Sequence, residues 1–414
     1  MHQKAATFPN LDGLRGLAAL SVVLWHYSLA FFPALNNRSA THPLAFGQLV
    51  ATTPLHLPLA GDFAVSVFFV LSGFVLSLSF FRSRSTSVLM SAAARRYFRL
   101  MLPALGSILL ACLLIWLGLM HNGQAAALTG SEGWLGRYWD FPANIFVALY
   151  QGLYAIFFTD FNSYNPVLWT MKLELLGSFM VFALLALFGR MRRRWIVYAV
   201  LGGLLLTTHF LPFIAGVAIA DIWVNRSSWQ ARLSPPVSTA LLVTGLLLGS
   251  VYISNYPNMY QRLQVGFIPD WQLTILLHSI GAVAVVLAVL RLGWLSRFMK
   301  TRPLQFLGRI SFSMYLLHFI IMGSLGSLLF ATLFPAFSFI ASFIVTFIVS
   351  MTATLVAAAL YTRYVDQPSI VLSKYLGNKM IGAQPQPQPM PAQSPAHMEA
   401  GKYPTINLAG KADA

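Results

Sequence analysis

Two ionisable side chains lie within one hydrophobic segment that is long enough to cross a bilayer. The segment, residues 11–32, reads LDGLRGLAALSVVLWHYSLAFF and contains Arg15 and His26, 11 positions apart (26 − 15). A helix turns about 100° and rises about 1.5 Å per residue, so both side chains share one face, roughly 16 Å apart along the axis. An ionisable group at membrane depth is costly and by default indicates a functional site. A neutral imidazole serves as a general base or nucleophile, and an arginine fork suits phosphate.

Small residues occupy the helix face between the two ionisable groups. The same stripe carries Asp12, Gly16 and Ala19. Small side chains let a backbone or a ligand approach a helix closely. We therefore expect this stripe to form a seam between Arg15 and His26 that a backbone or a ligand can approach closely.

A carboxylate is predicted at nearly the same depth as His26. Glu174, in NPVLWTMKLELLGS, lies roughly 12 Å below the outer end of its segment, and His26 lies about 9 Å below the outer end of its own. We expect Glu174 to orient the His26 ring and to stabilise its charged form. The alternative is that Glu174 is the structural partner of a buried cation.

Further polar groups follow the helical period in later segments. In GRISFSMYLLHFII, Ser311, Tyr315 and His318 share one face, and His318 falls near mid-membrane. The spacing does not decide whether His318 is a structural or a catalytic residue. In FFVLSGFVLS, Ser72 and Gly73 are small, and close helix packing is the expected role of this pair.

Arginines also gather at the start of the segment AARRYFRLMLP. These are Arg95, Arg96 and Arg99, and Arg15 is expected one short step deeper. Guanidinium groups bind phosphate through paired donors, so Arg15, Arg96 and Arg99 form a candidate anion site. Topology alone also explains a cluster of this kind, but it does not require a buried Arg15.

The composition is that of a membrane protein. Of the 414 residues, 57% are hydrophobic and only 9% are charged, against about 25% charged residues in soluble domains. The net charge is +16, but the cations stand in short clusters between apolar spans, which favours membrane topology over nucleic-acid binding. Cys112 is the only cysteine and lies in an apolar run, so an intramolecular disulfide and a cysteine-based metal site are excluded. No metal site is expected.

The apolar runs predict an all-α, polytopic transmembrane bundle of about ten spans. The spans are 11–32, 62–81, 100–120, 166–188, 195–209, 211–225, 236–254, 271–291, 308–333 and 338–361. With the N-terminus in the cytoplasm, the cation clusters at 82–99, 190–194, 226–232 and 291–302 all fall on the cytoplasmic side, as does the C-terminus.

Three segments need separate treatment. Residues 141–159 are apolar, but counting them as a span would reverse the loop charges, so we expect an interfacial or re-entrant helix. The short pair 195–209 and 211–225 is compatible with a broken hairpin. We expect a membrane domain over residues 1–376 and a disordered, Pro/Gln-rich cytoplasmic tail over 377–414.

Six ordered motifs resemble the acyltransferase 3 family of integral membrane acyltransferases. They span roughly residues 8 to 375: LDGLRGLAALSVVLWH with Arg15 and His26, FFVLSGF with Ser72 and Gly73, RRYFRLMLP with Arg96 and Arg99, LWTMKLE with Trp169 and Glu174, FLGRISFSMYLLH with Tyr315 and His318, and YTRYVDQP from Tyr361 to Pro368. The chain departs from the family pattern at Thr170, Met171, Phe312 and Asp366. None of these departures touches the Arg15–His26 pair.

The resemblance implies an O-acyltransferase with acyl-CoA, most often acetyl-CoA, as co-substrate and no bound cofactor. Arg15, Arg96 and Arg99 would hold the donor, whose pantetheine arm would run along the small-residue seam of residues 11–32. His26 and Glu174 would carry the chemistry. Tyr315, His318 and Trp169 would bind the acceptor or stabilise the oxyanion. The implied acceptor is a hydroxyl of a cell-surface or exported glycan, and the implied location is a bacterial inner membrane.

Two other functions fit parts of the pattern. A transporter or flippase of lipid-linked sugars also uses intramembrane His, Arg and Glu, but it would more often show repeated halves, which this sequence lacks. A membrane scaffolding protein would not need Arg15 and His26 on one face. An O-acyltransferase of a small secondary metabolite is a further alternative, and the oligomeric state is not predicted.

Overall fold

The computed structural model describes residues 8–36, 47–226, 233–252, 260–263 and 266–381. Within these residues every regular element is a helix, as expected for an all-α bundle. The tail beyond 381 lies outside the described residues. The helix α18 (Gln367–Met380) continues past the domain boundary expected at 376.

In the described part of the chain, seven helical stretches are long and apolar enough to cross a membrane. They are α1 (Pro9–Phe31), α3 (Gly61–Ser83), α4 (Thr86–Trp116), η5 with α8 (Pro166–Phe188), α13 (Asp270–Arg291), α15 with η7 and α16 (Arg302–Leu333), and α17 with η8 and α18 (Phe339–Met380). Each matches one of the predicted spans. The remaining predicted spans, 195–209, 211–225 and 236–254, correspond to the shorter apolar helices α9 (Arg194–Leu204), α10 (Leu211–Asn225) and α12 (Pro235–Gly249).

The other elements are short. The helices are α2 (Gly47–Thr52), α5 (Asn122–Thr129), α6 (Ile145–Tyr150), α7 (Ile156–Phe158) and α14 (Gly293–Met299). The short 3₁₀ helices are η1 (Pro33–Asn36), η2 (Pro54–Leu59), η3 (Leu135–Arg137), η5 (Pro166–Leu168) and η6 (Gln261–Leu263). The π-helical segments are η4 (Gln151–Ala155), η7 (Met322–Gly326) and η8 (Thr362–Asp366). The apolar segment expected to be interfacial or re-entrant forms α6, η4 and α7, which together are shorter than a full span.

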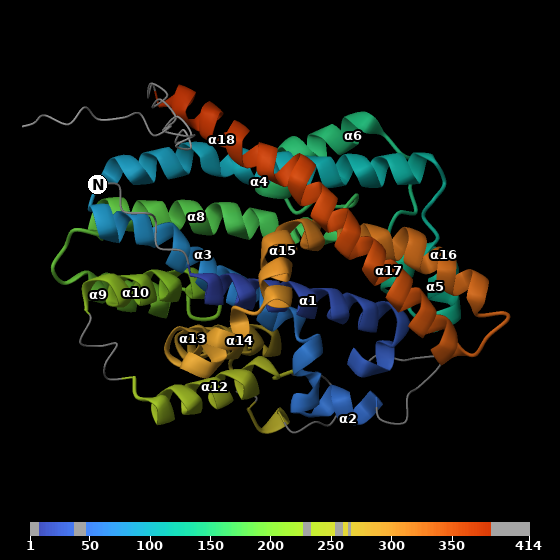
Figure 1. Ribbon diagram of the computed structural model, residues 1–414, viewed down its shortest axis with the longest axis horizontal. Coiled ribbons are helices and arrows are strands. Elements are labelled where there is room, and N and C mark those ends of the chain that lie inside the picture. The colour runs from blue at the N-terminus through green and yellow to red at the C-terminus, as the bar shows by residue number, and fades with distance from the viewer. Residues whose placement is uncertain (1–7, 37–46, 227–232, 253–259, 264–265, 382–414) are drawn as a thin grey trace, which may run out of the picture.

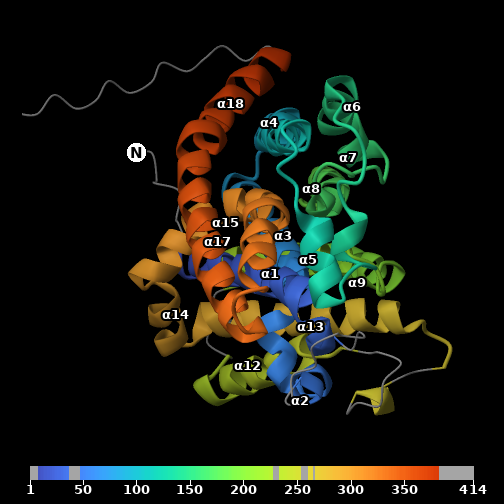
Figure 2. The same ribbon diagram turned by 90° about the vertical axis from the view of Figure 1, so that its right-hand side faces the viewer.

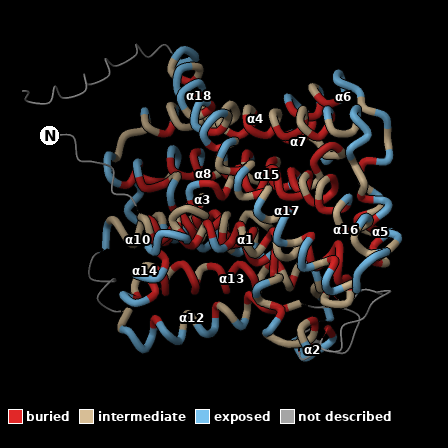
Figure 3. Tube along the Cα trace, turned by 45° about the vertical axis from the view of Figure 1, so that its right-hand side comes forward, coloured by how far each residue is buried: buried red, intermediate tan, exposed pale blue. Residues whose placement is uncertain are grey.

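The core of the bundle is built around α1 and α3. These two helices pack on each other, and α3 also packs on α8, α10 and α13. In Figure 1, α3 lies between α8 and α10, and α1 extends toward the other end of the long axis. Seen along that axis, α4 and α18 form the layer above them (Figure 2). Burial is concentrated on the inner helices, while α12 and α17 expose one apolar face (Figure 3), as a lipid-facing surface would.

The helices α1 and α15 run in the same direction and in matched register. Near their starts the backbones touch: a Cβ on Gly16 would lie 2.5 Å from the Gly308 nitrogen. Further along, the rings of His26 and His318 are hydrogen-bonded, again with a sequence separation of 292. The glycines are therefore what allows α15 to lie close enough for the two imidazoles to meet.

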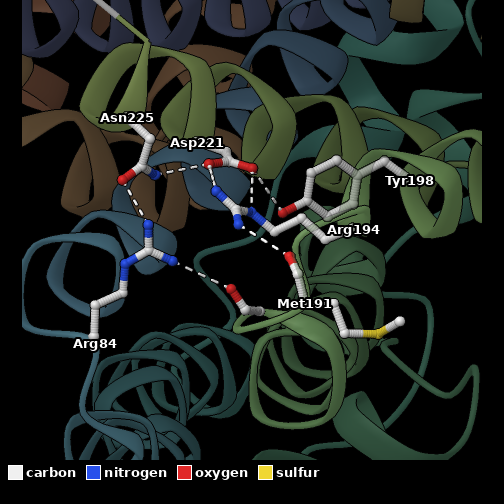
Figure 4. A network of polar contacts seen from close by, with 7 residues as sticks. Arg84, Met191, Arg194, Tyr198, Asp221 and Asn225 are labelled. Carbon is white, nitrogen blue, oxygen red and sulfur yellow. Dashed lines mark hydrogen bonds and ion pairs between the residues drawn. The ribbon is translucent and has the colours of Figure 1, made fainter.

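Arginine contacts join the cation-rich loops at one end of the bundle, which we call the cationic end. The Arg194 fork pairs with both carboxylate oxygens of Asp221 at 2.6 Å, and Asn225 links Asp221 to Arg84 (Figure 4). The carbonyl of Arg84 accepts a hydrogen bond from Arg190. These contacts connect the ends of α3, α8 and α10, and so give the loop cations a structural role in addition to any topological one.

Candidate active site

His26 and His318 form a hydrogen-bonded pair. Nδ1 of His26 lies 2.8 Å from Nε2 of His318. Nδ1 of His318 lies 3.0 Å from the Met314 carbonyl oxygen, which can only accept, so that nitrogen carries the hydrogen. Nε2 of neutral His318 then accepts the Nδ1–H of His26, and the lone pair of His26 remains on its Nε2. The pair thus fixes the tautomer in which His26 can act as a base or nucleophile.

Aromatic rings surround the half-buried His26. Its ring lies 5.8 Å from Trp134 in a stacked arrangement and 5.3 Å from Phe319 in an edge contact. Trp139 packs on Phe319 and donates its indole N–H to the Tyr164 carbonyl at 2.9 Å. The Trp139 backbone has φ of 57°, a region that non-glycine residues rarely adopt. These contacts hold the segment after α5 against the histidine pair.

Glu174 has a different partner from the one that its depth suggested. Its carboxylate forms an ion pair with the Arg96 guanidinium and accepts a hydrogen bond from the Ser72 hydroxyl. Arg96 also donates a hydrogen bond to the Ser178 hydroxyl at 2.7 Å. The ring that is hydrogen-bonded to His26 is His318, so the contact expected between Glu174 and His26 is not the one observed. The alternative, a structural pair with a buried cation, describes the observed contact.

The two small residues on α3, Ser72 and Gly73, make different contacts. Gly73 packs as expected, because a Cβ there would lie 2.2 Å from the Phe213 carbonyl oxygen of α10. Ser72, in contrast, donates to Glu174, so its hydroxyl belongs to the polar centre of the bundle and not only to helix packing.

The second arginine of the RRYFR motif is also paired. Arg99 lies 2.6 Å from the Asp366 carboxylate and over the Phe312 ring at 5.4 Å. Asp366 belongs to the YTRYVDQP motif, and Tyr361 of the same motif donates to the Pro103 carbonyl at 2.6 Å. Two motifs that are far apart in sequence are thus joined where α4 meets η8.

A cavity of about 480 Å³ lies between these helices. Its charged lining residues are Asp12, Arg15, Arg96, Arg99, Glu174, Arg309 and Asp366. Phe68 and Phe69 of α3 supply part of its apolar wall, and Thr170 and Tyr315 line it near the histidine pair. The cavity does not follow the seam expected on α1, because Gly16 is covered by Gly308 and Gly13 by the Met299 backbone. That expected route was wrong: the small residues admit a helix, and the cavity runs along α3 and α8 instead.

Tyr315 separates this cavity from the histidine pair. Its ring centroid lies 6.1 Å from that of His318, one helical turn further along α15. The hydroxyl donates to the Val167 carbonyl, and since a hydroxyl has one hydrogen, the 2.7 Å contact with Thr170 must have Thr170 as donor. The proton that an oxyanion would need is therefore already used. Trp169, the other expected acceptor residue, packs its ring against His209 at 5.6 Å and is 40% exposed.

Arg309 and Gln305 are among the cavity residues for which no function was predicted. Arg309 and Gln305 both line the cavity on α15, and the Gln305 amide nitrogen donates to the Pro9 and Met299 carbonyls at 2.6 and 2.9 Å. Arg309 lies inside the GRISFSMYLLH stretch and precedes Tyr315 and His318 on the same helix. Its position in that motif was the available signal.

Comparison with known proteins places the chain in a family of enzymes. The sequence profile of the acyltransferase 3 family, described as an acyltransferase domain, matches residues 8–361. The chain is 25% identical to acyltransferase clz18 of Cochliobolus lunatus, with 86% of this chain and 93% of the relative aligned. It is also 25% identical to O-acetyltransferase PaAT-1 of Phomopsis amygdali, over 91% of this chain and 86% of the relative.

A bacterial relative shows the same resemblance. Acyltransferase MdmB of Streptomyces mycarofaciens is 25% identical, over 78% of this chain and 80% of the relative. No solved structure matches the chain. With the family profile covering most of the sequence and seven helices among the described residues suited to crossing a membrane, the chain belongs to the acyltransferase 3 family and is an integral membrane O-acyltransferase.

Proposed function

We propose that this enzyme transfers an acyl group, first of all acetyl, from acyl-CoA to a hydroxyl of an exported or cell-surface glycan. The observation that carries the proposal is the hydrogen bond between His26 and His318, which leaves Nε2 of His26 as a free base in the membrane interior. A base with this arrangement suits removal of a proton from an alcohol.

The proposed reaction uses His26 as general base and then as general acid. Nε2 of His26 takes the proton of the acceptor hydroxyl while the acceptor oxygen attacks the thioester carbonyl. The tetrahedral intermediate expels the CoA thiolate, which receives the proton from His26 to give the free thiol and the ester. His318 holds the ring in the reactive tautomer, as the acid of a catalytic triad does, but without a charge. In the alternative route the acyl group rests on Nε2 of His26 before it passes to the acceptor.

The donor enters the proposed reaction through the arginine-lined cavity. Four arginines line it, and they outnumber its three carboxylates, so the cavity as a whole attracts the anionic CoA phosphates: Arg15, Arg96, Arg99 and Arg309. The acyl end would then approach Tyr315 and Thr170, beyond which the histidine pair lies. We further propose that the cationic end faces the cytoplasm of a bacterium, the compartment that supplies acyl-CoA.

The acceptor is proposed to meet His26 beside the tryptophans. Trp134 and Trp25, both half-buried, lie against the His26 ring and offer flat apolar surface to a pyranose ring. The same surface suits the second candidate, a small hydroxylated secondary metabolite. The names of the relatives identify acyl transfer but no acceptor.

A direct assay tests the proposal. Purified protein in lipid nanodiscs, given acetyl-CoA labelled in the acetyl group, is expected to release free CoA thiol, and faster when the acceptor is present. No release with any acyl-CoA would contradict the proposed donor. Mass spectrometry of surface glycans from a deletion strain is expected to show lost acetyl groups. Unchanged glycans together with an acetylated small molecule that disappears would favour the metabolite acceptor.

A further inference from the structure

The arginines of the cavity differ in how far they are already paired. The Arg96 guanidinium is bonded to Glu174 and Ser178, and its side chain is only 15% exposed. Arg99 is paired with Asp366 at 2.6 Å. Carboxylates of the protein thus occupy both guanidinium groups. An incoming phosphate would therefore meet two guanidinium groups whose charge is already balanced, and its attraction to either is weaker than to an arginine without a carboxylate partner.

Arg309 lines the same cavity without such a partner. None of the carboxylates in the described part of the chain forms an ion pair with it, and its side chain is exposed. Counting the charged lining residues gives four arginines and three carboxylates, a net charge of +1. Since Arg96 and Arg99 are neutralised by Glu174 and Asp366, the excess charge belongs to the group formed by Arg309, Arg15 and Asp12.

The helix packing places Arg309 and Arg15 at one level of the cavity. Gly16 and Gly308 are in backbone contact, and each arginine is the immediate neighbour of one of these glycines. Both arginines line the cavity, one from α1 and one from α15. The Arg15–Asp12 contact is long, at 3.3 Å, and the two side chains are 33% and 47% exposed. Such a pair is weak, so a phosphate can displace the Asp12 carboxylate from Arg15.

We propose that Arg309, together with Arg15, binds the phosphate groups of the nucleotide end of the acyl-CoA donor, while Arg96 and Arg99 hold the protein's own carboxylates. This inference rests on the proposed function. Two guanidinium forks on adjacent helices supply paired donors to the diphosphate and the 3′-phosphate. The apolar wall of α3 then receives the uncharged pantetheine arm.

The test compares acetyl-CoA with a donor that lacks the 3′-phosphate and with one that lacks the whole nucleotide. Wild type, Arg309→Ala and Arg309→Lys are assayed in nanodiscs of phosphatidylcholine with acetyl-CoA, acetyl-dephospho-CoA and acetyl-pantetheine. Arg309→Ala is expected to raise the KM for acetyl-CoA about tenfold to a hundredfold with kcat nearly unchanged. For acetyl-pantetheine, which has no nucleotide phosphates, kcat/KM is expected to stay within about twofold of wild type. The lysine variant, which keeps the charge but not the fork, should fall between.

Arg302→Ala is the matched control. Arg302 is an exposed arginine on the same helix that does not line the cavity, and its removal should leave KM unchanged. Equal losses with all three donors in Arg309→Ala, or no loss with any, would overturn the inference. So would an effect that appears only when anionic lipid is added, because Arg309 would then bind a lipid headgroup. Failure of wild-type protein to use any donor would instead contradict the proposed function.

Discussion

A histidine that is hydrogen-bonded to a second histidine is oriented by a neutral group. His318 accepts from His26 at Nε2 and donates to the Met314 carbonyl at Nδ1, so both of its ring nitrogens are used. A neutral partner fixes the tautomer of the base but stabilises the imidazolium less than a carboxylate does. The His26 imidazolium is therefore expected to be short-lived, which suits a base that returns its proton to the leaving thiolate.

Variants of His318 test whether its hydrogen bond orients the His26 ring. His318→Leu removes the acceptor for Nδ1–H of His26, and we expect kcat to fall about a hundredfold because the ring loses its fixed tautomer. His318→Gln keeps an acceptor oxygen and should retain a larger part of the rate. Steady-state kinetics together with the melting temperature of each variant measure this. Equal kcat in both variants would contradict the orienting role.

Glu174 is predicted to act on stability more than on chemistry. Glu174→Gln leaves the Arg96 guanidinium, 15% exposed, without its carboxylate, and breaking such a buried pair costs about 3 kcal/mol or more. Expression and melting temperature should fall together with activity. The double variant Arg96→Gln/Glu174→Gln removes both charges and is expected to be more stable than Glu174→Gln alone. A Glu174→Gln protein that is stable but has lost turnover would instead indicate a catalytic role for Glu174.

At the scale of elements, the contact between α1 and α15 sets the active geometry. Gly308→Ala would place a Cβ 2.3 Å from the Asp12 carbonyl oxygen, so α15 must move away from α1. A displacement of about 1 Å at the reacting groups can cost about a hundredfold in rate. We expect that loss in kcat for Gly308→Ala. Gly326→Ala, whose Cβ would be no closer than 3.6 Å to any atom, is the control and should keep its activity.

The sequence predicted the helices but not how they meet. Hydropathy identified α1, α3 and α15, and helical spacing placed Tyr315 and His318 on one face, since both depend on local periodicity. The matched register of α1 and α15 depends on contacts across 292 positions, which periodicity does not contain. Depth counted along each helix put Glu174 level with His26, but it could not tell which neighbouring helix each side chain faces.

At the scale of the whole molecule, one buried histidine outside the long helices predicts acid sensitivity. His56, in the η2 turn before α3, is buried, and burial lowers the pKa of its imidazole from 6.5 to about 4. As pH falls below 6.5 the unfolded chain gains this proton before the folded protein does, so stability decreases between 6.5 and about 4. The melting temperature of wild type should drop more from pH 7 to pH 5 than that of His56→Gln. Equal drops would contradict this account.

The family could be predicted from the sequence, but the pairing of its charged residues could not. Six motifs in order identified a membrane acyltransferase, and the family profile over residues 8–361 confirmed it. Arg96 and Arg99 were expected to bind phosphate through their guanidinium forks. Their carboxylate partners, Glu174 and Asp366, lie 78 and 267 positions away, so helical spacing could not reveal the two pairs. Only the three-dimensional contacts show which cations are already neutralised.

The most direct test of the central claim is acyl transfer by His26→Ala. Measured in nanodiscs with labelled acetyl-CoA, beside wild type and the control His121→Ala, the variant should retain the wild-type melting temperature. It should lose transfer by at least about a hundredfold, the usual contribution of a general base, while His121→Ala keeps its activity. Transfer by His26→Ala at the wild-type rate would contradict the claim that His26 is the base of this acyltransferase.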